Sequence, residues 1–412
     1  MLKLFFENSN FRAYLCFRTF SSIGGGMFGM FMMWVIHVQY QNPIYTGLAG
    51  AMFSALAIVN FLIGPFVDRN NKVAIIRMAC LAQFMVVSAV LAVSIGRTSS
   101  VWFMLPMIFI FSAASLLKNP AFTALLPKIV ASEDLIIANA LGSIVATFVG
   151  LGIGVFLFLA MRGASDFTII FIANAAVLLL ALITSMFMKR VEPKKNGSEE
   201  NSSLKEYLGE LKEGLTFVSR GAVVFLLFAL LAWDFAASVA YVNLPMFAEV
   251  HTGEAAGYII LAALSMVGSM IGAFLSRILG PKFDVWKIIA GTMIAAGVTR
   301  ILFVNVIADD FSRAIQIYIL YIGLATTALM IFETLMQKLP PKEMVARVDT
   351  ISTSLIGITS VFGALLGGIL GSALPNVDYV FIIQGIAYIT IGVFVCIPRC
   401  IRVLPKISEG EE

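Results

Sequence analysis

Charge is what this sequence has least of. Only 13% of its 412 residues are Asp, Glu, Lys or Arg, whereas 60% are hydrophobic and the mean hydropathy is +0.95. Soluble domains are about a quarter charged and about half apolar, so the composition excludes an ordinary soluble domain. The 28 basic residues nearly balance the 24 acidic ones and fall in predicted turns, not on one patch. We therefore expect no nucleic acid among the partners.

Histidine and cysteine are also scarce. The sequence holds two histidines and four cysteines, and the cysteines fall in or beside predicted membrane helices. This placement argues against a disulfide framework. Cys396 and Cys400 are one helical turn apart, a spacing that suits a metal, but neither histidine lies near them. We therefore expect no metal and no cofactor.

The motifs of common enzymes are missing as well. There is no GxxxxGK[ST] loop to hold nucleotide phosphates, and the run Gly24-Gly25-Gly26 lies inside an apolar helix without the required lysine. Neither HExxH nor CxxC occurs, and no Ser-His-Asp set can be assembled. We therefore predict that the chain is not an enzyme and does not draw its energy from ATP.

Long apolar runs are abundant instead. A membrane-spanning helix needs about 20 mostly apolar residues, and the sequence contains about twelve such runs. Among them are 101–118, 135–160 and 222–247, with a polar loop expected over 119–134. The only long polar stretch, 189–220, includes an amphipathic helix from Leu204 to Val218, which we expect to lie on the membrane surface or on the helix bundle. The chain is predicted to consist of an N-terminal half (1–188), a linker (189–220) and a C-terminal half (221–412).

A polar turn recurs at a fixed distance and indicates two related halves. Gly64-Pro65-Phe66-Val67-Asp68-Arg69 separates the apolar run 46–67 from the run 73–95. Gly272-Ala273-Phe274-Leu275-Ser276-Arg277 lies 208 residues further on, again at the end of an apolar run. Short turns between long apolar runs predict helical hairpins that cross the membrane and return.

These residues carry a resemblance to a known family. Gly64, Asp68 and Arg69 resemble the signature between the second and third helices of the major facilitator superfamily. The stretches 119–127, 132–135, 138–140 and 211–215 are similar to its macrolide-efflux and siderophore-exporter branch of drug:proton antiporters. The resemblance implies an all-α membrane protein with twelve helices in two pseudo-symmetric halves of six. It also implies secondary active transport by alternating access.

The sequence departs from that family at two places. Where the family often has a buried arginine in its fourth helix, the matching residue is Phe111, and the fifth helix keeps glycines but lacks the family's proline. Lys118 is a substitute for the arginine or an anchor at the membrane interface, and we favour the anchor.

The distribution of basic residues predicts the orientation. Of the 28, four are assigned to the outer side and the other 24 to the inner side; the outer four are Arg97, Arg162, Arg300 and Arg313. Since Lys and Arg accumulate in cytoplasmic loops, both termini are predicted to be cytoplasmic. The expected location is a bacterial cytoplasmic membrane.

Candidate functional residues follow from charge and chemistry inside the apolar runs. Asp234 lies near the middle of its predicted helix, where a carboxyl group is costly and usually functional, so we assign it to proton coupling. Glu333 is a second candidate for that role. The alternative for Asp234 is a structural carboxyl group that stays protonated or bonds to a hydroxyl group on another helix. Gly64, Asp68, Arg69 and Arg277 are expected to form a gate, with a plain hairpin turn as the alternative. The substrate cavity is predicted to be lined by Arg18, Met30, Met33, Trp34, Trp233 and Tyr241.

Three hypotheses for the function remain open at this point. The first is a proton-driven, monomeric exporter of amphipathic small molecules such as macrolide-like drugs. The second is an exporter of an endogenous siderophore, lipid or peptide. The third is a non-transporting membrane protein that binds a partner or confers immunity. Under the first two hypotheses, the expected partners of the protein are a small-molecule substrate, protons and the lipid bilayer.

Overall fold

The computed structural model describes residues 8–63, 66–67, 70–95, 100–130, 138, 141–142, 152, 167–189, 204–253, 255–341, 344–402 and 404. Within these residues the regular structure is entirely helical, and eleven helices are long and apolar enough to cross a membrane. The prediction of an all-helical membrane protein is confirmed. The span expected over 135–160 lies almost wholly outside the described residues.

The chain divides into two compact units. Unit 1 consists of Met1–Gln41 and Met52–Lys195, and unit 2 of Asn42–Ala51 and Asn196–Glu412. The division between Lys195 and Asn196 falls inside the predicted linker.

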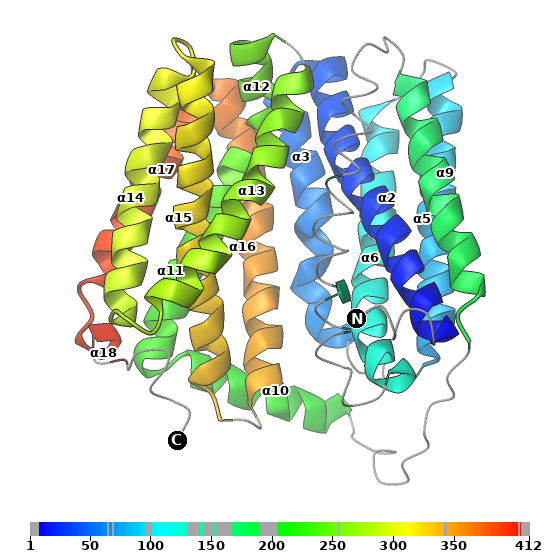
Figure 1. Cartoon of the computed structure of the whole chain (residues 1–412), viewed down its shortest axis with the longest axis horizontal. Helices are drawn as coiled ribbons and strands as arrows, with labels where there is room; N and C mark the ends of the chain where they lie inside the picture. The colour runs from blue at the N-terminus through cyan, green and yellow to red at the C-terminus, as the bar shows by residue number, and fades with distance from the viewer. Residues whose placement is uncertain are drawn as a thin grey trace. The chain divides into compact units, whose positions relative to one another are not determined.

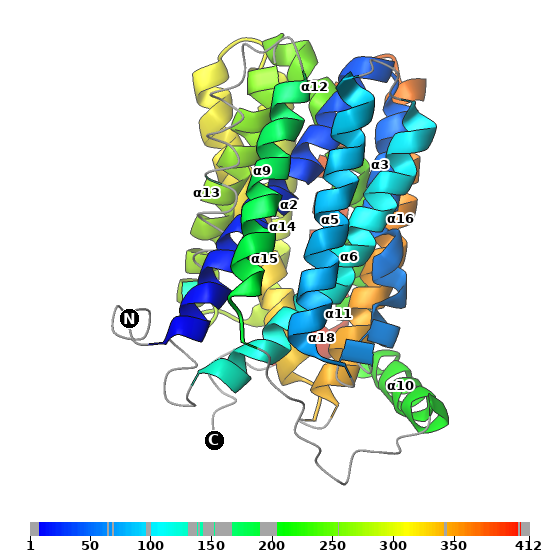
Figure 2. The same cartoon turned by 90° about the vertical axis from the view of Figure 1, so that its right-hand side faces the viewer.

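Unit 1 is built from helices that begin at polar caps and pack in pairs. Helix α5 lies beside α6 and α9, and α2 packs against α9 and α6 (Figure 2). The Asn8 side chain accepts hydrogen bonds from the first backbone N–H groups of α2, and Asn71 does the same for α5. The helices are α2 (Ser9–Tyr40), α3 (Pro43–Ser54, which begins in unit 2), the 3₁₀ helix η1 (Ala55–Leu62), α5 (Lys72–Ile95), α6 (Val101–Ile129) and α9 (Phe167–Met186).

Helix α6 is longer than the sequence suggested. The polar loop predicted over 119–134 is wrong in its first part, because the helix continues to Ile129 through Pro120 and Pro127. Proline is unfavourable inside a helix since it lacks a backbone N–H. Here the extension buries Phe122 against α2, with the Phe122 ring 4.0 Å from that of Tyr14 and 5.8 Å from that of Phe17. This aromatic packing offsets the cost of the prolines.

The second predicted span is not a uniform α-helix. It starts as α3 and tightens into η1 over Ala55–Leu62. A 3₁₀ helix has three residues per turn, and runs longer than three or four residues are uncommon. The tighter winding sets which side chains of this segment face α6, against which η1 packs.

Unit 2 contains the remaining helices. Helix α15 lies beside α13 and α14, and α14 packs on α17, while α11 contacts α16 and α17 (Figure 1). They are α10 (Leu204–Val218), α11 (Gly221–Tyr241), α12 (Leu244–Thr252), α13 (Ala255–Leu279), α14 (Val285–Val306), α15 (Phe311–Lys338), α16 (Val345–Ala373), α17 (Asp378–Val395) and α18 (Arg399–Arg402).

The single helix predicted over 222–247 is wrong. It breaks after Tyr241, and α12 starts at Leu244 with Pro245 in its first turn. Proline suits this position because the first N–H groups of a helix have no partner within it. The Asn243 side-chain amide at the break donates to the carbonyl oxygens of Val239 (2.9 Å) and Gly367 (2.8 Å), which ties the break to α16.

Helix α10 lies across the end of α16 (Figure 1). Arg347 of α16 donates a hydrogen bond to Glu213 (2.9 Å), and a methyl group added at Gly214 would meet the side chain of Ile351. Of the predicted apolar face, Val218 is buried but Leu215 is 52% exposed. Of the two predicted placements, these contacts favour the one on the helix bundle.

Glycines let α14 and α17 approach closely, which gives a testable prediction. A Cβ added at Gly297 would overlap the carbonyl oxygen of Gly385 and lie 2.6 Å from a side-chain carbon of Ile389. We expect Gly297→Ala to lower stability by about 1–3 kcal/mol, the usual cost of overpacking. The measurement is thermal unfolding of the purified protein in lipid nanodiscs.

The matched control lies on the same helix. A Cβ added at Gly291 meets nothing within 4 Å, so Gly291→Ala is expected to leave the unfolding temperature near that of the wild type. Equal unfolding temperatures for the two variants would contradict the close approach of α14 and α17.

Candidate functional site

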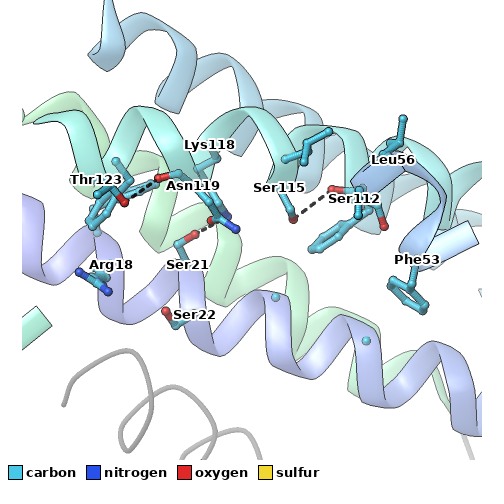
Figure 3. A pocket seen from close by; sticks show the side chains of 17 residues that line it. Arg18, Ser21, Ser22, Phe53, Leu56, Ser112, Ser115, Lys118, Asn119 and Thr123 are labelled. Atoms are coloured by element: carbon cyan, nitrogen blue, oxygen red, sulfur yellow. Dashed lines mark hydrogen bonds between the residues drawn. The ribbon is translucent and has the colours of Figure 1, made fainter. Parts of the chain in front are cut away.

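A cavity of about 670 Å³ in unit 1 is lined by α2, α6, η1 and the last turn of α3. Its wall combines two cationic side chains, Arg18 and Lys118, with five hydroxyl groups and four phenylalanine rings. None of the described residues that line it carries a carboxylate. Figure 3 shows Arg18, Ser21 and Ser22 on α2 opposite Lys118, Asn119 and Thr123 on α6. The other hydroxyls are Ser112 and Ser115, and the rings are Phe17, Phe53, Phe111 and Phe122.

Lys118 is a buried charged group of this wall. It is only 7% exposed. Its ammonium group donates hydrogen bonds to Ser21 Oγ (2.6 Å) and to Gln83 Oε1 (2.7 Å). The Gln83 amide in turn donates to Ser115 Oγ (2.8 Å). The hydrogen-bond partners of Lys118 in the described part of the chain are thus neutral oxygens. The anchor role favoured for Lys118 is wrong, because an interfacial anchor extends its charge to the lipid headgroups.

Arg18 lies on α2 near the same wall. Its guanidinium carbon is 5.2 Å from the centre of the Phe122 ring, which suits a cation–π interaction. A methyl group added at Gly142 would come within 2.5 Å of Arg18 Nη1, so the guanidinium rests against that glycine. Among the described residues, the groups that contact Arg18 and Lys118 are therefore neutral, and both side chains line one cavity.

Asp234 belongs to unit 2. It lies on α11, about 20 Å along the helix from Gly221 at 1.5 Å per residue. The hydroxyls of Thr359 (2.8 Å) and Ser360 (2.7 Å), both on α16, donate to the same carboxyl oxygen of Asp234. These hydroxyl contacts across helices also agree with the alternative, a structural carboxyl group. The assignment of Asp234 to proton coupling stays a prediction.

A second buried cation lies in unit 2. Arg300 is 3% exposed and packed inside the unit, and its assignment to the outer side stays a prediction. Its guanidinium carbon lies over four rings, 4.5 Å from Phe381, 4.6 Å from Tyr321, 5.4 Å from Phe303 and 5.7 Å from Tyr318. Its Nε donates to Gln384 Oε1 (2.9 Å), while its Nη1 has no partner among the described residues. Aromatic faces replace the carboxylate that a buried arginine usually pairs with.

The residues that line the unit 1 cavity do not include the other predicted cavity residues. Met33 and Trp34 are buried in unit 1, and neither they nor Met30 line the cavity. In unit 2, Trp233 stacks on Tyr388 with ring centres 6.4 Å apart, and Tyr241 at the end of α11 is half exposed. The part of these residues in substrate binding stays a prediction.

The remaining candidates concern gating and coupling. Gly64, Asp68 and Arg69 lie outside the described residues. Arg277 is exposed near the end of α13. Glu333 is exposed on α15, close enough to Asp349 of α16 for their carboxyl groups to interact electrostatically. The structure thus brings Arg18 and Lys118 to one cavity, and it places Glu333 beside a second acid that the sequence analysis missed.

The fold agrees with comparison to known families. Residues 14–351 match the sequence profile described as Major Facilitator Superfamily, which is well over half of the chain. The chain belongs to this superfamily. It is therefore a secondary transporter and not an enzyme.

Known relatives fit this placement. The transporter is 25% identical over 297 residues to the uncharacterized MFS-type transporter YvqJ of Bacillus subtilis (strain 168), covering 68% of this chain and 67% of the relative. Its structure is similar to that of the nucleoside transporter NupG, with a TM-score of 0.72, 14% identity, and coverage of 95% of this chain and 99% of NupG. The structure is also similar to that of a bacterial homologue of the human lysosomal transporter Spinster. The TM-score is 0.64 at 16% identity, and 94% of each chain is covered. At these identities the two structures indicate the fold alone.

Proposed function

We propose that this transporter is a proton-coupled exporter of amphipathic small molecules. The observation that carries the proposal is the cavity of unit 1, which lies among membrane-spanning helices and offers both hydrogen-bonding groups and aromatic rings. Binding sites for amphipathic ligands combine largely apolar walls with a few placed polar groups. The third hypothesis, a non-transporting partner protein, gives no reason for buried ionisable groups in spanning helices.

Asp234 supports the choice of protons as the coupling ion. A carboxyl group inside a spanning helix can bind a proton from one side of the membrane and release it to the other. If substrate and proton favour different states of the transporter, proton entry drives substrate exit. The bias of basic residues supports a cytoplasmic location for both termini, and the Bacillus relative supports a bacterial cytoplasmic membrane.

Transport by the purified protein tests this proposal. Proteoliposomes with an acidic lumen are offered three fluorescent probes that share a dansyl-aminoethyl body: dansyltaurine (anionic), dansylethanolamine (neutral) and dansylethylenediamine (cationic). Proton exit then drives probe entry, so at least one probe should accumulate above its external concentration. Collapse of the pH gradient with nigericin should remove the accumulation. Absence of gradient-dependent accumulation of all three probes, relative to empty liposomes, would overturn the proposal.

A further inference from the structure

The described residues that line the unit 1 cavity carry positive charge only. Two cationic side chains line it, and none of its described lining residues is acidic. In a site with little water such an imbalance is costly, because a buried charge needs a partner of opposite sign or several hydrogen bonds. Phe122 supplies a ring face to Arg18, and Ser21 and Gln83 supply neutral oxygens to Lys118. The described wall of the site therefore carries positive charge without a negative partner.

We propose that this cavity binds the negatively charged group of an amphipathic organic anion, with Lys118 and Arg18 as its cationic partners. This inference deepens the proposed function and rests on it, since the bound anion is the transported molecule. The charged group is an oxyanion such as a carboxylate, sulfonate or phosphate.

The hydrogen-bond inventory of the cavity suits an oxyanion. A lysine ammonium group has three N–H donors, and two of those of Lys118 are used by Ser21 and Gln83. No acceptor for the third is found among the described residues, so it can serve a ligand. Arg18 adds a guanidinium group, which presents several donors in the flat geometry that carboxylates and phosphates accept. Ser22 of α2 adds a further hydroxyl group to the lining of the cavity (Figure 3).

The rest of the wall determines the other end of the ligand. Phe53 and Leu56 line the cavity from α3 and η1, and Phe111 lines it from α6. Phe111 is fixed by stacking on Phe28 of α2, with ring centres 3.9 Å apart. Flat apolar faces of this kind accept aromatic or aliphatic bodies. A molecule with an apolar body and one oxyanion thus satisfies both parts of the cavity.

The same charges disfavour amine-bearing drugs. An ammonium group placed near Lys118 and Arg18 meets like charges at short range and finds no carboxylate in the described wall. The predicted class of macrolide-like drugs includes molecules with amino groups, and the cavity is a poor match for them. An anionic endogenous product, as in the second hypothesis, fits better.

Binding of the three dansyl probes to the protein in phosphatidylcholine nanodiscs tests the charge preference. Probe fluorescence is titrated with protein, and empty nanodiscs give the background. We expect dansyltaurine to bind the wild type about 10- to 100-fold more tightly than dansylethanolamine, the effect of hydrogen bonds to charged groups. Dansylethylenediamine should bind most weakly. Equal affinities for the anionic and neutral probes would contradict the inference.

Variants of the protein test whether the preference for the anionic probe depends on Lys118. Lys118→Met should reduce the preference for dansyltaurine over dansylethanolamine to within about threefold, because it removes the charge at similar size. The neutral probe should keep its affinity, which shows that the cavity is still folded. Lys128→Met is the matched control, since Lys128 lies on the same helix but is exposed and outside the cavity. It should behave as the wild type.

Arg18→Met provides a second, independent variant. It should also lower the preference for the anion, and it covers the case in which Lys118→Met does not fold. A full preference for dansyltaurine in both variants would overturn the assignment to this cavity. Gradient-driven uptake of only the neutral or cationic probe would sink the inference and leave the proposed function standing. Tight binding of dansyltaurine without any gradient-driven uptake would contradict the proposed function, and only the anion-binding part of the inference would remain.

Discussion

The Asp234→Asn variant is expected to lose uphill transport while keeping downhill movement of the same probe. In proteoliposomes with an acidic lumen, the accumulation of dansyltaurine should fall from well above its external concentration to about equality. Asparagine cannot exchange a proton, so the substrate equilibrates without being driven. Its amide oxygen still accepts hydrogen bonds from Thr359 and Ser360, so the contact with α16 survives.

The control for this prediction is the same Asp→Asn substitution at an exposed position. Asp309 lies in the exposed turn between α14 and α15, so Asp309→Asn should transport as the wild type does. Wild-type accumulation by Asp234→Asn, with an unchanged response to the pH gradient, would show that the proton uses another group. Glu333 is then the next residue to replace.

The Arg300→Ala variant is expected to show the largest loss of stability. It removes a cation that lies over Phe381, Tyr321 and two further rings, and it leaves Gln384 without its donor. A desolvated cation–π contact contributes about 2 kcal/mol and truncation of a large buried side chain costs about 2–5 kcal/mol. Since these terms overlap, we expect a loss of about 3–5 kcal/mol, measured as a lower unfolding temperature in nanodiscs.

Two further variants separate packing from charge. Arg300→Lys keeps the charge but lacks the flat guanidinium group that covers several rings, so its unfolding temperature should lie between those of Arg300→Ala and the wild type. Arg313→Ala removes an arginine whose side chain is 79% exposed and whose ion pair with Asp310 stays within one helix. Such exposed pairs contribute about 0–1 kcal/mol, so this control should unfold near the wild type. A stability of Arg300→Ala equal to that control would refute the role of the aromatic cluster.

The sequence predicted most of the fold because the bilayer imposes it. Apolar runs of membrane length must form helices, and their ends follow from polar caps such as Asn8 and Asn71. The errors occurred where packing outweighed local preference. Phe122 stabilises a helix across Pro120, and Asn243 stabilises a break that an unbroken apolar run concealed. Neither contact can be inferred from residues close in sequence.

The candidate site was harder to predict for the same reason. Lys118 resembles an interfacial anchor when only its own helix is considered. Its partners Ser21 and Gln83 are 97 and 35 residues away in sequence, so only the fold brings them to its ammonium group. Arg300 likewise depends on rings from three helices. A usable signal was present, because polar side chains within apolar runs are costly unless they meet one another.

The most direct test of the account follows protons and substrate together. Proteoliposomes containing the pH-sensitive dye pyranine, with equal pH on both sides and the membrane potential clamped by valinomycin and potassium, receive dansyltaurine from outside. The account predicts that the lumen becomes more alkaline as the probe enters, because each entry is coupled to proton exit, and that Asp234→Asn vesicles take up the probe without this change. Entry of dansyltaurine into wild-type vesicles at constant lumenal pH would contradict proton-coupled export.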